Sequence, residues 1–280
     1  MSPAPMSFAA VSFASMSSAL SEPGRQAHGA QDFSLAHGTL HELYAGTEAD
    51  GASLSALAMM LGEASKREGA REDAREVTLW VRHEALTREA GAPHPAGLAE
   101  LGLDPGRLLL LRARDAPSAL QGGLEGARCA ALGAVIIELR GEARAYDLTA
   151  SRRLALAARA SGVSVFVVRA AAAPMPSAAE TRWLARAAPS RALAAKAPGH
   201  PAFHLVLLRA RNGQEGSQHH LEWNRDAQRL ESNPSGHGET APARQPDGGA
   251  STPLSRGVVA IPVHRPDTAR DEPPPHRRAG

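Results

Sequence analysis

The chain has a single cysteine, Cys129, among its 280 residues. One thiol excludes a disulfide within the chain and any zinc site built from several cysteines, as is usual in a reducing compartment. Aromatic residues are also scarce, at 4%, although hydrophobic residues as a whole make up 43%. The core must therefore be built mainly from Ala, Leu and Val, a composition that suits helices packed closely on a sheet.

Long apolar stretches are missing as well. The sequence has no run of about 18 apolar residues, which a membrane-spanning helix would need. The first twenty-four residues carry no basic segment and no unbroken apolar stretch of the kind found in signal peptides. The formal net charge is only +2, so bulk charge does not indicate a nucleic-acid binder, although a pI near 9.1 leaves room for local positive surfaces. We expect a soluble, cytoplasmic protein without membrane contact.

Short apolar runs alternate with longer stretches of helical periodicity, which predicts an α/β fold with a mainly parallel, twisted sheet and flanking helices. The predicted strands are Thr39 to Ala45, Val77 to Val81, Leu108 to Leu111, Ala134 to Leu139 and Val163 to Val168. The predicted helices are Leu54 to Glu68, Ala116 to Leu132, and Leu148 to Ala160 with Asp147 as N-cap. Phe203 to Leu208 and His219 to Trp223 are expected to form an antiparallel hairpin at the end of the sheet.

Composition also divides the chain into segments. We expect a disordered segment over residues 1–30, one α/β domain over 31–231, and a linker over 232–256 that has too few apolar residues to fold. A short strand-like segment follows at 257–264, and a Pro-rich charged tail at 265–280.

The strand-like segment has two interpretations. Its apolar residues could pair with an edge strand of the chain's own sheet, or they could add a strand to a partner protein. These residues are Val258, Val259, Ile261 and Val263.

The most informative segment follows the first predicted strand and precedes a predicted helix. It has the glycine spacing of a phosphate-binding loop: Gly46 and Gly51 are present and Ser53 supplies the hydroxyl, but Ala52 stands where the lysine belongs. Without that cation, and with the acidic Glu48 and Asp50 nearby, the loop lacks the charge needed to stabilise phosphoryl transfer. We therefore predict a vestigial nucleotide site that does not hydrolyse ATP, and leave binding of ATP open.

A second part of such a site would be acidic. Glu138, in the predicted strand Ala134 to Leu139, stands where a nucleotide hydrolase of this class places a carboxylate for magnesium and water. The alternative is that Glu138 only ends a buried strand and caps the neighbouring turn.

Several further segments, in this order along the chain, resemble the ImuA family of RecA relatives. They are His37 to Leu43, Gly97 to Asp104, Asp147 to Leu156, Ala188 to Ser190, Pro201 to Arg209 and Leu221 to Asp226. The stretch Gly102 to Leu109 is also similar to the corresponding part of RecA recombinases. The resemblance extends over roughly residues 32–266.

This resemblance implies a RecA-like scaffold in error-prone translesion DNA synthesis during the SOS response to DNA damage. The implied partners are an ImuB-type polymerase-like protein, an error-prone replicative-type DNA polymerase and RecA. Two alternatives stay open: an active recombinase-like ATPase that binds DNA, and a SulA-like inhibitor of cell division.

Basic residues after the vestigial site could contact phosphates or a partner. Weak, non-specific DNA contact is one interpretation, because neutralising backbone charge drives such binding, and a solvated helix face is the other. The candidates are Arg152, Arg153, Arg182, Arg186 and Arg191, with Lys196 in the same stretch.

The histidines and tryptophans carry no predicted chemistry. His37 and His41 lie in a turn entering a strand, where four-residue spacing separates the imidazoles, so we predict packing and hydrogen bonding and no metal site. Trp80, Trp183 and Trp223 are expected to anchor the core or an interface, with base stacking by Trp183 as an alternative. No catalytic residue and no cofactor are predicted.

Overall fold

The computed structural model describes residues 32–68, 76–84, 88, 91–197, 199–212 and 215–232, and the observations below concern these residues. The chain divides into two units, Met1–Gly238 and Glu239–Gly280, and all the described residues belong to the first. The predicted segments 1–30, 257–264 and 265–280, and the predicted linker apart from Ser232, lie outside the described residues.

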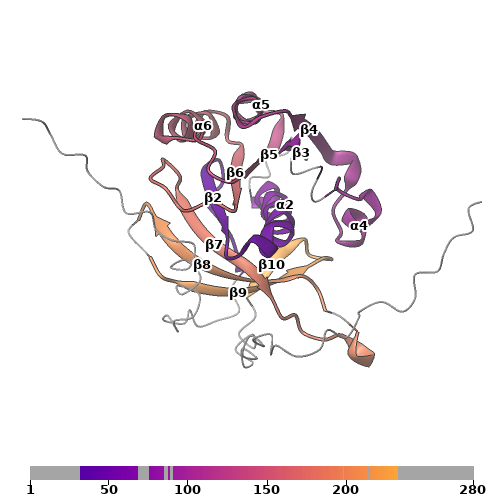
Figure 1. Ribbon diagram of the computed structural model, residues 1–280. Helices are drawn as coiled ribbons and strands as arrows, with labels where there is room; N and C mark the ends of the chain where they lie inside the picture. Colours follow the sequence, from indigo (N-terminus) through magenta and orange to yellow (C-terminus); the bar gives the residue numbers. More distant parts are fainter. Residues whose placement is uncertain are drawn as a thin grey trace, which may run out of the picture. The chain divides into compact units, whose positions relative to one another are not determined.

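Ten strands and four α-helices make up the described part of the chain (Figure 1). No described helix has the length and apolar character needed to cross a membrane. The strands are β1 (Asp32–Phe33), β2 (Leu40–Ala45), β3 (Val77–His83), β4 (Leu108–Ala113), β5 (Leu132–Arg140), β6 (Ser164–Ala170), β7 (Thr181–Ala188), β8 (Ala202–Ala210), β9 (Gln218–Asn224) and β10 (Arg229–Ser232). The helices are α2 (Gly51–Glu68), α4 (Pro95–Glu100), α5 (Ala116–Arg128) and α6 (Leu148–Ser161), with 3-10 turns at Glu48–Asp50, Pro105–Arg107 and Ala194–Lys196.

All ten strands form one sheet in the order β1-β10-β9-β8-β7-β2-β6-β5-β3-β4. The six strands from β7 to β4 are mutually parallel, and β8, β9, β10 and β1 extend the sheet as antiparallel strands. The strand β2 is separated from the next strand of the chain, β3, by β6 and β5, so the chain crosses over its own later strands. The predicted α/β class, with a mostly parallel central sheet and flanking helices, is confirmed.

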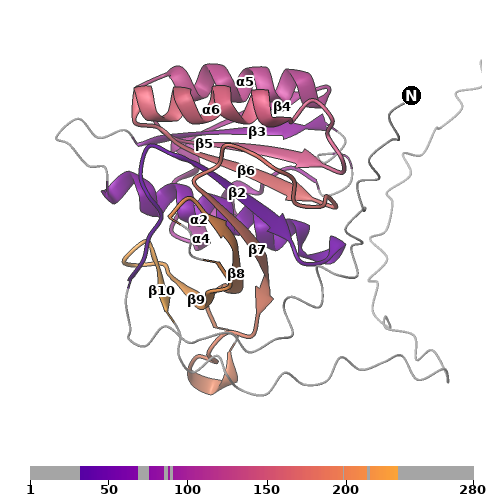
Figure 2. The ribbon, with the colours of Figure 1, turned by 90° about the vertical axis from the view of Figure 1, so that its left-hand side faces the viewer.

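One face of the sheet is covered by α5 and α6, which lie side by side (Figure 2). Small residues allow this close packing: Gly123 and Gly126 of α5 lie directly on strands β5 and β3, where an added Cβ would collide with Ile137 and Leu79. Asp147 is the N-cap of α6, as predicted, because its carboxylate accepts a hydrogen bond from Ala150 N at 2.7 Å.

The helix α2 lies on the other face and is surrounded by the sheet, which curls around it (Figures 1 and 2). The helix packs against β5 and β6 on one side and against β10 on the other. Its residues from Leu54 to Leu61 are apolar or small on every side, and nearly all of them are buried. A helix that is apolar all round is stable only when it is enclosed, which explains why this segment is the centre of the larger core.

The predicted strands before residue 170 and the three predicted helices are all present, with ends that differ by a few residues. The largest of these differences is in α5, which ends at Arg128 instead of Leu132. The predicted hairpin is also present as β8 and β9, but its predicted position at the end of the sheet is wrong, because β10 and β1 lie beyond it. The strand β7 was not predicted, because its sequence TRWLARAA has no regular alternation.

The three tryptophans are buried, as predicted. Trp80 is 5% exposed, Trp183 is 4% exposed and Trp223 is fully buried. Trp183 belongs to the larger of the hydrophobic core clusters, and its Nε1 donates to Thr181 Oγ1 at 2.8 Å. This burial removes the alternative that Trp183 presents its ring to a nucleobase.

A buried histidine joins the parallel strands β2 and β7. The ring of His41 stacks on Phe166, its Nε2 lies 2.9 Å from Ala36 O, and its Nδ1 lies 2.8 Å from Thr181 Oγ1. Because the carbonyl oxygen of Ala36 can only accept, we assign the proton of the neutral ring to Nε2, and the Thr181 hydroxyl then donates to Nδ1. The prediction that His41 takes part in packing and hydrogen bonding is confirmed.

This histidine should make stability depend on pH. Burial lowers the pKa of His41 from 6.5 to about 4, because desolvation disfavours the charged ring. The unfolded chain therefore binds a proton first as the pH falls, and the stabilising effect of the neutral ring, complete above pH 6.5, is lost between pH 6.5 and 4. We expect the free energy of unfolding to fall by about 3 kcal/mol over this interval because of His41.

Urea denaturation at a series of pH values measures this loss. The variant His41→Gln is the control, because it keeps hydrogen-bonding groups but cannot titrate. His219, whose pKa is also lowered by burial, adds a dependence of the same sign to both proteins. Equal pH slopes for the wild type and His41→Gln would show that the interpretation is wrong.

Candidate functional site

The segment with phosphate-loop spacing connects β2 to α2. Gly46 N donates to Ala185 O of β7 at 2.9 Å, so the chain is still attached to the sheet when the loop begins. A single 3-10 turn over Glu48–Asp50 follows, and α2 begins at Gly51. The predicted strand–loop–helix arrangement is therefore present, and the loop lies at the carboxyl end of β2, where ligands bind in open α/β sheets.

The side chain of Asp50 occupies hydrogen-bond donors of this loop. Its Oδ2 accepts from Thr47 N at 2.9 Å and from Thr47 Oγ1 at 2.8 Å, and its Oδ1 accepts from Ala187 N at 3.2 Å. In a working phosphate loop, backbone N–H groups surround the phosphates. Here an internal carboxylate takes one of these N–H groups and attaches the loop to β7.

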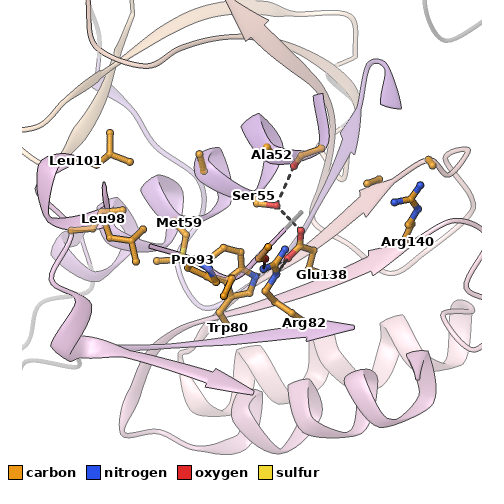
Figure 3. A pocket seen from close by; sticks show the side chains of 17 residues that line it. Ala52, Ser55, Met59, Trp80, Arg82, Pro93, Leu98, Leu101, Glu138 and Arg140 are labelled. Atoms are coloured by element: carbon orange, nitrogen blue, oxygen red, sulfur yellow. Dashed lines mark hydrogen bonds and ion pairs between the residues drawn. The ribbon is translucent and has the colours of Figure 1, made fainter. Parts of the chain in front are cut away.

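The carboxylate of Glu138 lies at the centre of a buried polar cluster, which we call the Glu138 cluster: Ser55 of α2, Trp80 and Arg82 of β3, and Glu138 of β5 (Figure 3). Glu138 Oε1 accepts from the Ser55 hydroxyl at 2.6 Å. Its Oε2 accepts from Arg82 Nε at 2.6 Å and from Trp80 Nε1 at 3.1 Å.

The strand register brings these groups together. Arg82 and Glu138 are direct neighbours in the pairing of β3 with β5. The side chains of both are only 5% exposed, and Arg82 Nη1 also donates to Gly91 O at 2.8 Å. A buried ion pair with this many hydrogen bonds is charge-balanced.

The structure contradicts one of the two sequence interpretations of Glu138. Glu138 does not end its strand or cap a turn, since β5 continues to Arg140. It does lie near the helix that follows the loop, but three donors of the protein occupy its oxygens. A carboxylate has about four lone-pair positions, so little acceptor capacity is left for magnesium or water.

A cavity of about 290 Å³ opens above the Glu138 cluster (Figure 3). Gly51 and Ala52 at the start of α2 line one side of it, together with Met59. The lining also includes the apolar side chains of Pro93, Leu98, Leu101 and Leu103. The lining is thus mostly apolar, and its polar residues are those of the Glu138 cluster and the exposed Arg140.

The structure brings together part of the predicted nucleotide site. Gly51, Ala52 and Glu138 line the same cavity, whereas Gly46 and Ser53 are not among the lining residues. Sequence reasoning missed Ser55 and Arg82. The sequence does place a basic residue, Arg82, near the end of one buried strand and an acidic residue, Glu138, near the end of another. Only the strand register shows that the two side chains meet.

The predicted contact arginines have different surroundings. Arg152 and Arg153 are exposed in the second turn of α6, and Arg191 is exposed beyond β7. Arg186 is half-buried on β7. Contact of these four side chains with DNA or a partner stays a prediction.

The prediction for Arg182 is corrected, because its side chain lies in the core. Arg182 Nε donates to Glu42 Oε2 at 2.7 Å, and Glu42 is fully buried. The hydroxyl of Tyr146 donates to the other oxygen of Glu42 at 2.5 Å, and burial, together with the nearby Glu42 carboxylate, raises the pKa of Tyr146 well above its usual value. Arg182 is therefore a structural ion-pair partner and is unavailable to a phosphate.

Among the residues that the structure describes, no group of three or more His, Cys, Asp or Glu side chains is arranged to hold a metal ion.

Comparisons with known proteins give only distant likenesses. No family model matches the chain, and no curated protein matches it. One similar solved structure is that of the RadB recombinase, with a TM-score of 0.45 and 18% identity, covering 68% of this chain and 89% of that one. Another is SulA from Pseudomonas aeruginosa, with a TM-score of 0.33 and 23% identity, covering 46% of this chain and 96% of that one. The fold class stated above rests on the strand order alone.

The ion pair of the Glu138 cluster can be tested directly. We expect Arg82→Met to lower the free energy of unfolding by about 3–5 kcal/mol, because it leaves a buried carboxylate without its cation. The double variant Arg82→Met/Glu138→Met should lose less than Arg82→Met alone, because it removes both charges. Urea denaturation of the three proteins measures these differences.

Arg128→Met is the matched control, since Arg128 forms an exposed ion pair with Glu125 whose side chains are both 58% exposed. Its cost should be below about 1 kcal/mol. If Arg82→Met cost no more than Arg128→Met, the cluster would not be the buried, charge-balanced unit described here.

Proposed function

We propose that this protein is a RecA-like accessory protein that does not hydrolyse ATP and that helps to assemble the machinery of error-prone translesion DNA synthesis in the SOS response. The order of its parallel strands supports the RecA-like class, because the loop strand β2 lies between β6 and β7 and not beside β3. The segments that resemble the ImuA family support the finer function.

The observation that carries the non-catalytic part is the state of the two carboxylates. Asp50 bonds to the loop itself, and Glu138 is held by Arg82, Trp80 and Ser55. Nucleotide hydrolysis in this class depends on a lysine at the phosphates and on an acidic side chain near magnesium. In this chain Ala52 stands in place of the lysine, and the acidic side chain, Glu138, is already paired with Arg82.

The proposed partners follow the same resemblance: an ImuB-type polymerase-like protein, an error-prone replicative-type DNA polymerase and RecA. In this proposal the α/β domain presents surfaces to partners and does no chemistry of its own. Arg152, Arg153 and Arg191 are exposed, and in this proposal they make weak DNA contact at such an assembly.

A nucleotide assay tests the non-catalytic part. Purified wild-type protein should show no magnesium-dependent release of phosphate from labelled ATP. Restoring the loop cation with Ala52→Lys should not restore turnover, because Glu138 would still be paired with Arg82. Turnover by the wild type that Glu138→Gln abolishes would contradict the proposal and favour the recombinase-like ATPase.

A binding assay tests the partners. The immobilised full-length protein should retain purified ImuB or RecA, whereas an unrelated bait of similar size and charge should not. Loss of all such binding would count against the scaffold. Filamentation of cells that overexpress the protein, without such binding, would favour the SulA-like inhibitor instead.

A further inference from the structure

The outer edge of the sheet at β4 is unusually apolar. β4 is the last strand in the sheet order and pairs with β3 on one side, and no described residue pairs with its other side. Leu109 is 55% exposed, Leu110 39% and Leu111 41%. Native proteins usually protect an edge strand with charges, proline or a bulge, because its free N–H and C=O groups can pair with another chain. Here β4 opens with four consecutive leucines, the last three of them exposed, before its first charge, Arg112.

These leucines lie on both faces of the sheet. Leu111 faces α5, since an added Cβ on Gly122 would collide with its side chain, and Leu109 shares this face because side chains alternate along a strand. Leu110 lies on the opposite face, in register with Trp80 of β3. A helix could cover only one of the two faces, whereas an added strand continues both. The edge therefore fits a strand as its partner.

We propose that this strand is β4 of a second copy of the chain, paired antiparallel about a two-fold axis at Leu110. A two-fold axis perpendicular to the sheet keeps the faces of the two copies on the same sides, so opposite residues must belong to the same face. With the axis at Leu110, each Leu109 lies opposite Leu111 of the second copy, and the two Leu110 residues lie opposite each other. All three exposed leucines then meet leucine.

Charge favours the same register. With the axis at Leu110, Arg112 lies opposite Leu108 of the second copy, so its aliphatic part can cover an apolar neighbour. An axis at Leu111 would place Leu110 opposite Arg112, and an axis at Arg112 would place the two guanidinium groups opposite each other, which is destabilising. The run from Leu108 to Arg112 is thus self-complementary in only one of these registers.

The predicted contact is small. A ladder of five residues per copy buries less than the roughly 1,200 Å² that stable interfaces reach. The dimer should accordingly be weak, and the dimeric fraction should rise with the protein concentration. This contact is independent of the proposed function, because it uses no residue of the loop or of the Glu138 cluster.

Cysteine cross-linking of the full-length protein tests the register. In a background of Cys129→Ser, Leu110→Cys should form a disulfide between copies under mild oxidation, because opposite residues in antiparallel strands have Cα atoms about 4.5–5.5 Å apart, within the span of a disulfide. Leu109→Cys should cross-link poorly with itself, since two such residues would be about 8 Å apart, but efficiently when mixed with Leu111→Cys. Leu156→Cys, at a leucine of α6 that is 67% exposed, is the control for random collision.

Analytical ultracentrifugation over a range of concentrations gives the second readout. The wild type should shift from the mass of one chain toward that of two, Leu110→Lys should abolish this shift, and Leu156→Lys should leave it unchanged, with circular dichroism confirming that each variant is folded. A wild type that stays monomeric throughout, or equal cross-linking by Leu109→Cys and Leu110→Cys, would overturn the proposal.

Discussion

The enclosure of α2 is the constraint on which the rest of the structure depends. A helix that is apolar on all sides cannot lie on a flat sheet with one side in water, so the sheet must continue past its parallel part and curl around it. The antiparallel strands β8, β9 and β10 supply that cover, and Trp223 and Leu230 bring their side chains to it. The same helix begins at the loop that follows β2, so the requirement for burial also places Ala52 and Ser55 at the cavity.

The electrostatics of the site differ from those of a nucleotide hydrolase in the origin of the positive charge. A working loop brings its cation to a ligand, whereas here the cation comes from β3 and serves a carboxylate of the protein. The buried charges of the site are therefore balanced within the protein, the cavity lining is mostly apolar, and Asp50 bonds to Thr47 of the loop. The favourable free energy of binding a ligand in such a cavity would come mainly from apolar contacts.

Much of this architecture could be predicted from the sequence, because the apolar runs and the Asp147 cap are local signals. The strand β7 could not, since Arg182 and Arg186 interrupt its apolar pattern. Only the buried Glu42, which neutralises Arg182, makes a charged residue acceptable there. The loop was found from its glycine spacing, but the neutralisation of Glu138 by Arg82 depends on the register of two strands that are 49 residues or more apart along the chain. Long-range pairing of this kind leaves no mark in local sequence.

The curled sheet also bears on how the chain is made. Synthesis proceeds from the N-terminus, and α2 is complete at Glu68, whereas β9 and β10, which cover its far side, end at Asn224 and Ser232. More than half of the protein must therefore emerge while an apolar helix has only part of its cover. Such an exposed surface slows folding and favours aggregation in nascent chains, so this protein is one for which chaperones on the ribosome should matter more than its modest size suggests.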